Sequence, residues 1–246
     1  FAASDLTTQT VTVTITGADD DVTAGADQTG AVTEDATATT ATGTIAGSDA
    51  DDASSLAYTG DATGTYGAIA VVSGSGAWTY TLSNSDADTT ALDAGDSVTD
   101  TFTMTVTDSA SGETDTMAVT ITITGANDAP SAGSDGTGAV TEDASTSTST
   151  GSISATDADD AAAFTYSGDA TGTYGAIAVD SAGAWTYTLS NSDADTTALD
   201  AGDSVTDTFT MTVSDGTASD TMDVVITVTG ADDDVTAGAD QTGAVT

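Results

Sequence analysis

The sequence predicts an all-β protein made of tandem β-sandwich repeats of 105 to 108 residues. Two observations carry this prediction. Long stretches of the chain occur twice at a fixed spacing, and apolar residues alternate with threonine at a period of two in each copy. A third observation supports it, because almost no segment shows the 3.6-residue period of a helix.

The repeat is visible in the chain's own copies. The string GADDDVTAGADQTGAVT occurs at 17–33 and again at 230–246, and a 30-residue block at 77–106 is identical to 184–213. The second repeat is three residues shorter, and the missing residues fall in two Gly/Ser/Asp turns, where hairpin loops tolerate changes in length. The predicted domains are 1–17, the end of a preceding repeat; 18–125, the first full repeat; 126–230, the second full repeat; and 231–246, the start of a following repeat.

Each full repeat contains the strands of a sandwich. In the first repeat, apolar residues alternate with threonine over 78–82, 102–106 and 117–123, so one face of each strand is apolar and the other is hydroxylated. Shorter strands are expected around Val32, Ile45, 56–58 and 69–71, which gives seven or eight strands per repeat. A short helical turn is expected over 88–92.

The charge of the chain restricts what it binds. It has 40 acidic residues and no lysine, arginine or histidine, so its formal charge is −40 and the counter-charge must come from solution. Without cysteine or histidine, the metal ligands available are oxygen atoms. Oxygen ligation favours hard cations, and Ca²⁺ before Mg²⁺, because Ca²⁺ accepts the irregular shells that Asp/Asn loops supply.

The same composition argues against most enzyme classes. Ser-His-Asp and Cys-His systems, Schiff-base lysines and phosphate-binding basic patches lack their residues, so we expect no enzyme and no nucleic-acid partner. A pair of carboxylates acting as a glycosidase acid and base is the remaining enzymatic reading, but nothing separates such a pair from the other acids. No apolar run approaches 18 residues, so this segment is not expected to insert into a membrane, and Phe1 begins no signal peptide, so an export signal is expected elsewhere.

The distribution of the acids points to cation binding. Only three of the 40 acidic residues are glutamate, and Glu34 and Glu142 occupy the same position in the repeat. Aspartates cluster in turns, as at Asp49 and Asp51, where two carboxylates about 4 Å apart repel by about 4 kcal/mol at an effective dielectric of 20. A divalent ion reverses the sign of that interaction, although solvated turns also favour aspartate.

The combined motifs resemble a known family. GAVTED, DADD, GTYGAIAV, GAWTYTL, LDAGDSVTDTFTMTV and TITITGANDAP together resemble the VCBS repeat of large bacterial surface proteins and the related cadherin-like domains of RTX-type adhesins. The resemblance covers essentially the whole chain. It implies tandem Ig-like/cadherin-like β-sandwiches outside the cell, with calcium at their junctions, in the stalks of adhesins and biofilm proteins.

The resemblance also implies a set of calcium ligands. They are a glutamate near the start of a repeat, a D-x-D after the second strand, acids before a late strand, and an Asn-Asp linker. Carried onto this sequence, and with the two linkers that carry Asp-Asp instead, the expected metal ligands are Asp19, Asp20, Glu34, Asp49, Asp51, Asp100, Asn127, Asp128, Glu142, Asp157, Asp159, Asp207, Asp232 and Asp233.

Two functions follow as hypotheses. The first is a calcium-stiffened extracellular extender of a cell-surface or secreted protein, whose partners are the adjacent repeats of the same chain and an unidentified receptor. The alternative is a subunit of an extracellular filament or sheath, in which other copies of the chain are the partners.

Three other interpretations carry less weight. The loop from Asp86 is not an EF-hand, because Ala91 stands where glycine is needed and Ser97 where glutamate is needed. Trp78 and Trp185 alternate with strand residues, so core packing is expected rather than a sugar-stacking platform. The threonine array at 10–16 is similar to ice-binding surfaces, but exposed strands have the same composition.

Overall fold

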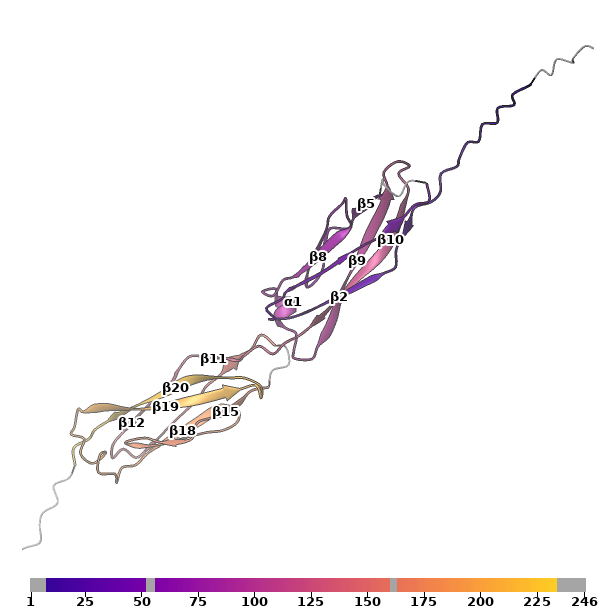
Figure 1. Ribbon diagram of the computed structural model, residues 1–246. Helices are drawn as coiled ribbons and strands as arrows, with labels where there is room; N and C mark the ends of the chain where they lie inside the picture. Colours follow the sequence, from indigo (N-terminus) through magenta and orange to yellow (C-terminus); the bar gives the residue numbers. More distant parts are fainter. Residues whose placement is uncertain (1–7, 52–55, 160–162, 234–246) are drawn as a thin grey trace, which may run out of the picture. The chain divides into compact units, whose positions relative to one another are not determined.

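The structure, a computed structural model, describes residues 8–51, 56–159 and 163–233. It confirms the all-β prediction, and in these ranges the four-residue α1 (Ala87–Thr90) is the one α-helix (Figure 1). The chain divides into two compact units, the first made of residues 1–84 and 97–124, the second of 85–96 and 125–246.

The first unit contains two four-stranded sheets. One has the order β2 (Gln28–Thr33), β10 (Thr114–Thr124), β9 (Ser97–Asp108) and β5 (Leu56–Thr59). The other has the order β3 (Thr40–Thr44), β8 (Ala77–Leu82), β7 (Gly67–Val71) and β6 (Ala62–Thr63). A two-stranded pair joins β1 (Thr23–Ala24) to β4 (Gly47–Ser48).

The second unit repeats this topology. Its first sheet has the order β12 (Gly136–Thr141), β20 (Ser219–Thr229), β19 (Ser204–Ser214) and β15 (Thr165–Ser167). Its second sheet has the order β13 (Thr148–Ser152), β18 (Ala184–Leu189), β17 (Gly175–Val179) and β16 (Ala170–Thr171). The short pair is β11 (Ser131–Ala132) with β14 (Ala155–Thr156).

One strand pair in each unit is parallel, and the other strand pairs of the described chain are antiparallel. β2 runs parallel to β10, from Gln28 beside Val119 to Thr33 beside Thr124. β12 runs parallel to β20 in the equivalent register. The first and last long strands of each unit are therefore direct neighbours.

The core of each unit follows from the predicted alternation. In β10, Val119, Ile121 and Ile123 are fully buried, while the threonines between them face outward. Trp78 and Trp185 are both buried, which confirms that they pack in the core. Such burial of apolar surface is the main stabilising contribution, about 25 cal/mol per Å².

A buried carboxylate connects the two sheets of the first unit. Asp100 on β9 is 4% exposed, and its Oδ1 accepts from the backbone N–H of Thr65, at 2.9 Å. Its Oδ2 accepts from the N–H of Tyr66, at 3.1 Å, and from the Tyr80 hydroxyl, at 2.8 Å. A Cβ on Gly64 would lie 2.5 Å from this carboxylate, so only glycine fits there. We call this arrangement the carboxylate clasp.

The second unit has the same clasp. Asp207 accepts from the N–H groups of Thr173 and Tyr174, at 2.8 and 3.1 Å, and from the Tyr187 hydroxyl at 2.9 Å. Burial raises the pKa of Tyr80 and Tyr187, and the aspartate hydrogen bonds raise it further, so both phenols remain protonated donors. The GTYG motif is thus a structural loop whose consecutive N–H groups enclose an anion.

Two local features can be compared with the sequence. Glycine is required at position 125 because a Cβ there would collide with the carbonyl oxygens of Leu92 and Asp93. The expected helical turn at 88–92 is α1, one residue earlier and N-capped by Asp86, whose side chain accepts from the N–H of Asp88. The identical sequence in the second repeat forms turns instead, as expected for a helix this short.

Candidate functional site

The linker acids of the second unit lie against the acids of its D-x-D motif. The Asn127 side chain donates to Asp215 Oδ2 at 3.0 Å, and the Asp128 N–H donates to Asp159 Oδ2 at 3.1 Å. The Asp159 N–H in turn donates to Asp157 Oδ1 at 3.2 Å. Four of the expected metal ligands and Asp215 are therefore linked by hydrogen bonds into one group. We call Asn127, Asp128, Asp157, Asp159 and Asp215 the base cluster of the second unit.

Two carboxylate oxygens of this base cluster are buried without a hydrogen-bond donor in the described chain. Asp159 is 8% exposed, and its Oδ1, like Oδ2 of Asp157, is buried with no hydrogen-bond partner in the described chain. Burial raises the pKa of Asp159, as do the charges of Asp157 and Asp128, while the Asp128 N–H opposes the shift. A buried anionic oxygen without a donor is costly, and a bound cation is the usual compensation.

The remaining carboxylate of the cluster is stabilised as an anion. Donation by the N–H of Ala218 and by the Asn127 amide lowers the pKa of Asp215, with a further contribution from the N–H of Thr217. Asn127, Asp159 and Asp215 also line one hollow in the surface of the unit. Asp215 therefore provides a carboxylate that is stabilised as an anion next to a space open to solvent.

The first unit has an equivalent base cluster with more charge. The Asp20 N–H donates to Asp51 Oδ2 at 2.7 Å, and the Asp51 N–H donates to Asp49 Oδ1 at 2.8 Å. Burial raises the pKa of Glu113, and the nearby charges of Asp21, Asp19, Asp49 and Asp108 raise it further. This end of the unit thus collects anionic groups that repel one another.

The opposite end of each unit presents the repeated glutamate. Glu34 and Glu142 are 2% and 1% exposed, and their backbone N–H groups donate to the carbonyl oxygens of Thr124 and Thr229. Glu142 Oε2 accepts from the N–H of Ala231, the residue before Asp232 and Asp233, at 3.2 Å. Glu142 Oε1 is buried with no partner in the described chain. Glu142 is thus placed beside the linker that follows its unit.

Asp100 and Asp207 do not lie in these groups. They were expected in a loop before a strand, but they lie inside β9 and β19, where they face the interior and form the carboxylate clasps. Their oxygens already accept from two N–H groups and a hydroxyl, so their surroundings differ from those of the linker acids.

One position in the cluster is not among the ligands expected from the sequence. Asp215 directly follows β19, and its repeat equivalent Asp108 is the last residue of β9. Asp108 is 2% exposed and accepts from the N–H groups of Ala110 and Ser111. The clue in the sequence is that an aspartate stands there in both repeats, at the start of a turn whose length changes.

The residues of the base clusters suit a hard cation in their chemistry but not in their present spacing. Among the described residues, no three acidic side chains are close enough together to enclose a metal ion as they stand. The donor set is nonetheless chemically suitable, because it combines carboxylate and amide oxygens with buried oxygens that lack hydrogen-bond donors.

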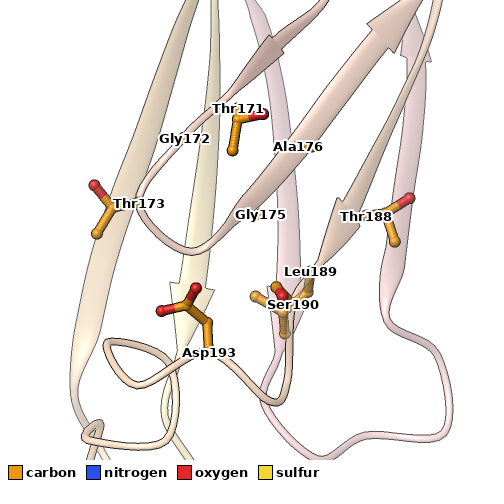
Figure 2. Close-up of a pocket in the computed structure, with 9 residues that line it drawn as sticks. All are labelled: Thr171, Gly172, Thr173, Gly175, Ala176, Thr188, Leu189, Ser190 and Asp193. Carbon is orange, nitrogen blue, oxygen red and sulfur yellow. The ribbon is translucent and has the colours of Figure 1, made fainter.

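Another hollow lies elsewhere on the second unit. It is lined by Thr171, Gly172, Thr173, Gly175, Ala176, Thr188, Leu189, Ser190 and Asp193, and Figure 2 shows mainly hydroxyl and backbone groups around it. Asp193 is the one charged side chain that lines it (Figure 2). No buried unpartnered group points to a ligand there. In the described chain, the helix present is also too short to cross a membrane.

Several solved cadherin structures have a similar fold. The chain is similar to mouse clustered PcdhgC3 EC1-3, with a TM-score of 0.52 and 17% identity over 86% of this chain and 68% of that one. It is similar to Drosophila N-cadherin EC1-4, with a TM-score of 0.54 and 16% identity over 86% of this chain and 50% of that one. For mouse Cadherin-23 EC22-24 the values are 0.50, 19%, 85% and 65%.

The sequence itself identifies the family. No curated protein sequence matches the chain. The profile of the bacterial cadherin-like domain matches residues 19–125 and 127–230, which are almost the two predicted full repeats. These two matches cover most of the chain, and both sandwiches have the fold of the cadherin structures. The chain therefore belongs to the bacterial cadherin-like domain family.

Proposed function

We propose that this chain is an extracellular structural and adhesive segment of a bacterial surface protein, in which Ca²⁺ bound at the ends of each sandwich stiffens the linkers between repeats. The segment acts as an extender rather than as an enzyme. With 11 residues in each of β10 and β20 and a rise of about 3.3 Å per residue, each sandwich contributes about 36 Å of length.

One observation carries the calcium part of the proposal. Asp157 Oδ2, Asp159 Oδ1 and Glu142 Oε1 are buried carboxylate oxygens without a hydrogen-bond donor in the described chain. Since the sequence contains no basic side chain, no protein group can supply the missing positive charge. A calcium ion from the surroundings would supply it.

The proposed ligands lie at the two ends of each unit. In the second unit they are the base cluster, which is Asn127, Asp128, Asp157, Asp159 and Asp215. In the first unit the equivalent residues are Asp19, Asp20, Asp49, Asp51 and Asp108. At the opposite ends, Glu34 and Glu142 contribute, the latter with Asp232 and Asp233. Asp100 and Asp207 are left out, because the clasp occupies their oxygens.

Calcium binding to the folded state stabilises it by mass action. At a concentration 100 times the Kd, one site adds about 2.7 kcal/mol to the free energy of unfolding. Neutralising part of the −40 charge also relieves repulsion within each base cluster. We therefore expect the full chain to melt at a higher temperature in calcium than in EGTA.

The test uses the full chain and two variants. Asp157→Asn combined with Asp159→Asn keeps the size of both side chains but removes two charges, so calorimetric titration should show at least one fewer strong calcium site. Asp88→Asn removes an exposed charge on α1 and serves as the control, because it should leave the titration unchanged. If the melting curve of the parent chain were the same in calcium and in EGTA, the calcium part of the proposal would be wrong.

Stiffening is a separate measurement. The chain has no cysteine, so Thr103→Cys on β9 and Thr210→Cys on β19, both at exposed positions, allow one spin label in each unit. Double electron–electron resonance should then give a narrow distribution of label distances in calcium and a broad one in EGTA. Equal widths in the two conditions would contradict a stiffened linker even if calcium binds.

One observation favours the alternative, a filament or sheath subunit. Val11, Val13 and Ile15 are 83%, 76% and 89% exposed, whereas their repeat equivalents Val119, Ile121 and Ile123 are fully buried in β10. This segment forms no strand within the described chain, and an exposed alternating segment of this kind can add as a strand to a sandwich of another copy. Electron microscopy of the chain in calcium separates the two functions: separate thin particles support the extender, and ordered fibres support the filament.

A further inference from the structure

The order of strands in each unit determines how it responds to tension. The first long strand of the first unit, β2, lies beside the last one, β10, and runs parallel to it over six register pairs (Figure 1). Since the chain enters the unit before β2 and leaves it after β10, tension pulls β2 backward and β10 forward along the same axis. The two strands are therefore pulled in shear.

Shear and peeling break a ladder differently. When two neighbouring strands are pulled lengthwise in opposite directions, all of their hydrogen bonds resist together, whereas strands pulled apart from one end lose their bonds one after another. The second unit has the same geometry, because β12 runs parallel to β20 from Gly136 beside Val224 to Thr141 beside Thr229. The other four-stranded sheet of each unit contains neither of these strands.

Aspartate side chains lengthen both parallel ladders. Asp27, just before β2, accepts from the N–H of Ala118 on β10, at 2.8 Å. In the second unit, Asp135 accepts from the N–H of Asp223 on β20, at 3.0 Å. Each carboxylate adds one connection at the end of the ladder where tension enters, and both are at the same repeat position.

We infer that the parallel pairs β2–β10 and β12–β20, extended by Asp27 and Asp135, are mechanical clamps that set the force at which each sandwich unfolds. This inference rests on the proposed role as an extender, because only a chain held at both ends under tension uses such a clamp. It goes beyond that role in locating the mechanical resistance inside each sandwich. It requires no metal ion, so it is independent of calcium binding.

The first test compares two pulling directions on the full chain in EGTA. Handles at Ala129→Cys and Asp232→Cys pull β12 and β20 in shear. Handles at Ala129→Cys and Thr217→Cys pull from the end of the unit where β20 begins, so that β12 is peeled from β20. We expect an unfolding force several times larger in the first geometry. Equal forces, or a larger force in the second geometry, would overturn the inference.

A second test uses matched aspartates in the first geometry. Asp169 resembles Asp135, because it is exposed and accepts from a strand N–H, that of Val179, at 2.7 Å, but it lies in the sheet outside the clamp. Asp135→Ala should lower the unfolding force, whereas Asp169→Ala should leave it unchanged, although both variants should lose similar resistance to urea. An unchanged force for Asp135→Ala, or an equal fall for both variants, would count against the clamp.

These outcomes are distinguishable from a failure of the calcium proposal. Both clamp tests are made without calcium and measure the force of unfolding. The calcium proposal concerns titration, melting and the spread of label distances. A chain could therefore lose either property while retaining the other.

Discussion

The two repeats differ most informatively around two tryptophans that stand in identical sequence. Trp78 and Trp185 are both 2% exposed and lie in the same 30-residue block. The Trp78 indole N–H donates to Gln28 Oε1 at 2.9 Å, but that of Trp185 has no acceptor in the described chain, because Gly136 stands where the first repeat has Gln28. Two segments of identical sequence thus differ in hydrogen bonding, because the neighbouring strand supplies an acceptor for the indole N–H in the first unit but not in the second.

The base clusters of the two units also differ, in the number of carboxylates that they contain. The first repeat carries Asp19, Asp21 and Glu113, and the equivalent positions of the second are Asn127, Ala129 and Ala218. Three carboxylates are therefore replaced by uncharged groups at the same end of the unit. Self-repulsion in the absence of cations should be stronger in the first unit.

The largest expected loss of stability comes from removing the carboxylate clasp, which the two units share. Asp100→Ala and Asp207→Ala each leave two backbone N–H groups and a tyrosine hydroxyl buried without their acceptor, which should lower the free energy of unfolding of the affected unit by about 3 kcal/mol. Urea denaturation followed by fluorescence measures this, with Trp185→Phe or Trp78→Phe isolating one unit.

The exposed neighbours Thr101→Ala and Thr208→Ala are the controls and should shift the midpoint little. Equal losses for Asp100→Ala and Asp207→Ala would support an equivalent clasp in both units. A loss below that of the threonine controls would show that the clasp contributes nothing to stability.

A smaller change in stability is expected when the acceptor of the tryptophan indole is removed from the first unit or introduced into the second. Gln28→Ala removes the acceptor of the Trp78 indole and should destabilise the first unit by about 1 kcal/mol. Gly136→Gln should stabilise the second unit by less than that, because a Cβ there would lie 3.0 Å from Val224 Cγ2 and part of the gain is lost to the contact.

Urea midpoints and the emission maximum of each tryptophan measure the exchange. Gln28→Glu keeps the acceptor for Trp78 but, like Gln28→Ala, loses the donation from the Gln28 amide to the Thr44 carbonyl oxygen, so it serves as the control for that second hydrogen bond. If Gln28→Ala and Gln28→Glu had the same stability, the hydrogen bond to Trp78 would have no measurable role.

The smallest effect concerns pH. Donation by the N–H groups of Ala24 and Thr116 lowers the pKa of Asp115, and donation by those of Ala132 and Thr221 lowers the pKa of Asp220. A lowered folded-state pKa contributes stability that is present above the ordinary carboxyl pKa and is lost as pH falls through the folded value. Both units should therefore lose stability in acid through these groups.

Glu113 should oppose that trend in the first unit, as Asp159, whose pKa is also raised by burial, should in the second. Its pKa is raised, so its contribution is present at pH below the ordinary glutamate value and is lost as pH rises through the higher folded value. Glu113→Gln should accordingly raise the melting temperature of the first unit at neutral pH in EGTA. Ser219→Gln in the second unit is the control, and a fall in melting temperature for Glu113→Gln would refute the assignment.

Much of the fold could be predicted because two periods are visible in the sequence, the two-residue alternation of the strands and the repeat of 105 to 108 residues. The period-two alternation at 117–123 placed the inner face of β10, and the copied strings predicted a tandem repeat. For the candidate site, the sequence picked out Glu34 and Glu142 through their repeated position, and the aspartates of the D-x-D motif through their clustering. Whether these residues bind calcium stays a prediction.

The rest depended on contacts between distant segments. Asp100 and Asp207 look like any other turn acids in the sequence, yet the sheets turn them inward, where the GTYG loop supplies donors 34 and 35 residues away in the first unit. Asp215 became part of the base cluster only when Asn127, 88 residues earlier, reached it. Local composition determined which residues were strands and acids. Tertiary structure decided which acids are buried and donated to, because burial and hydrogen-bond partners are set by segments that are far apart along the chain.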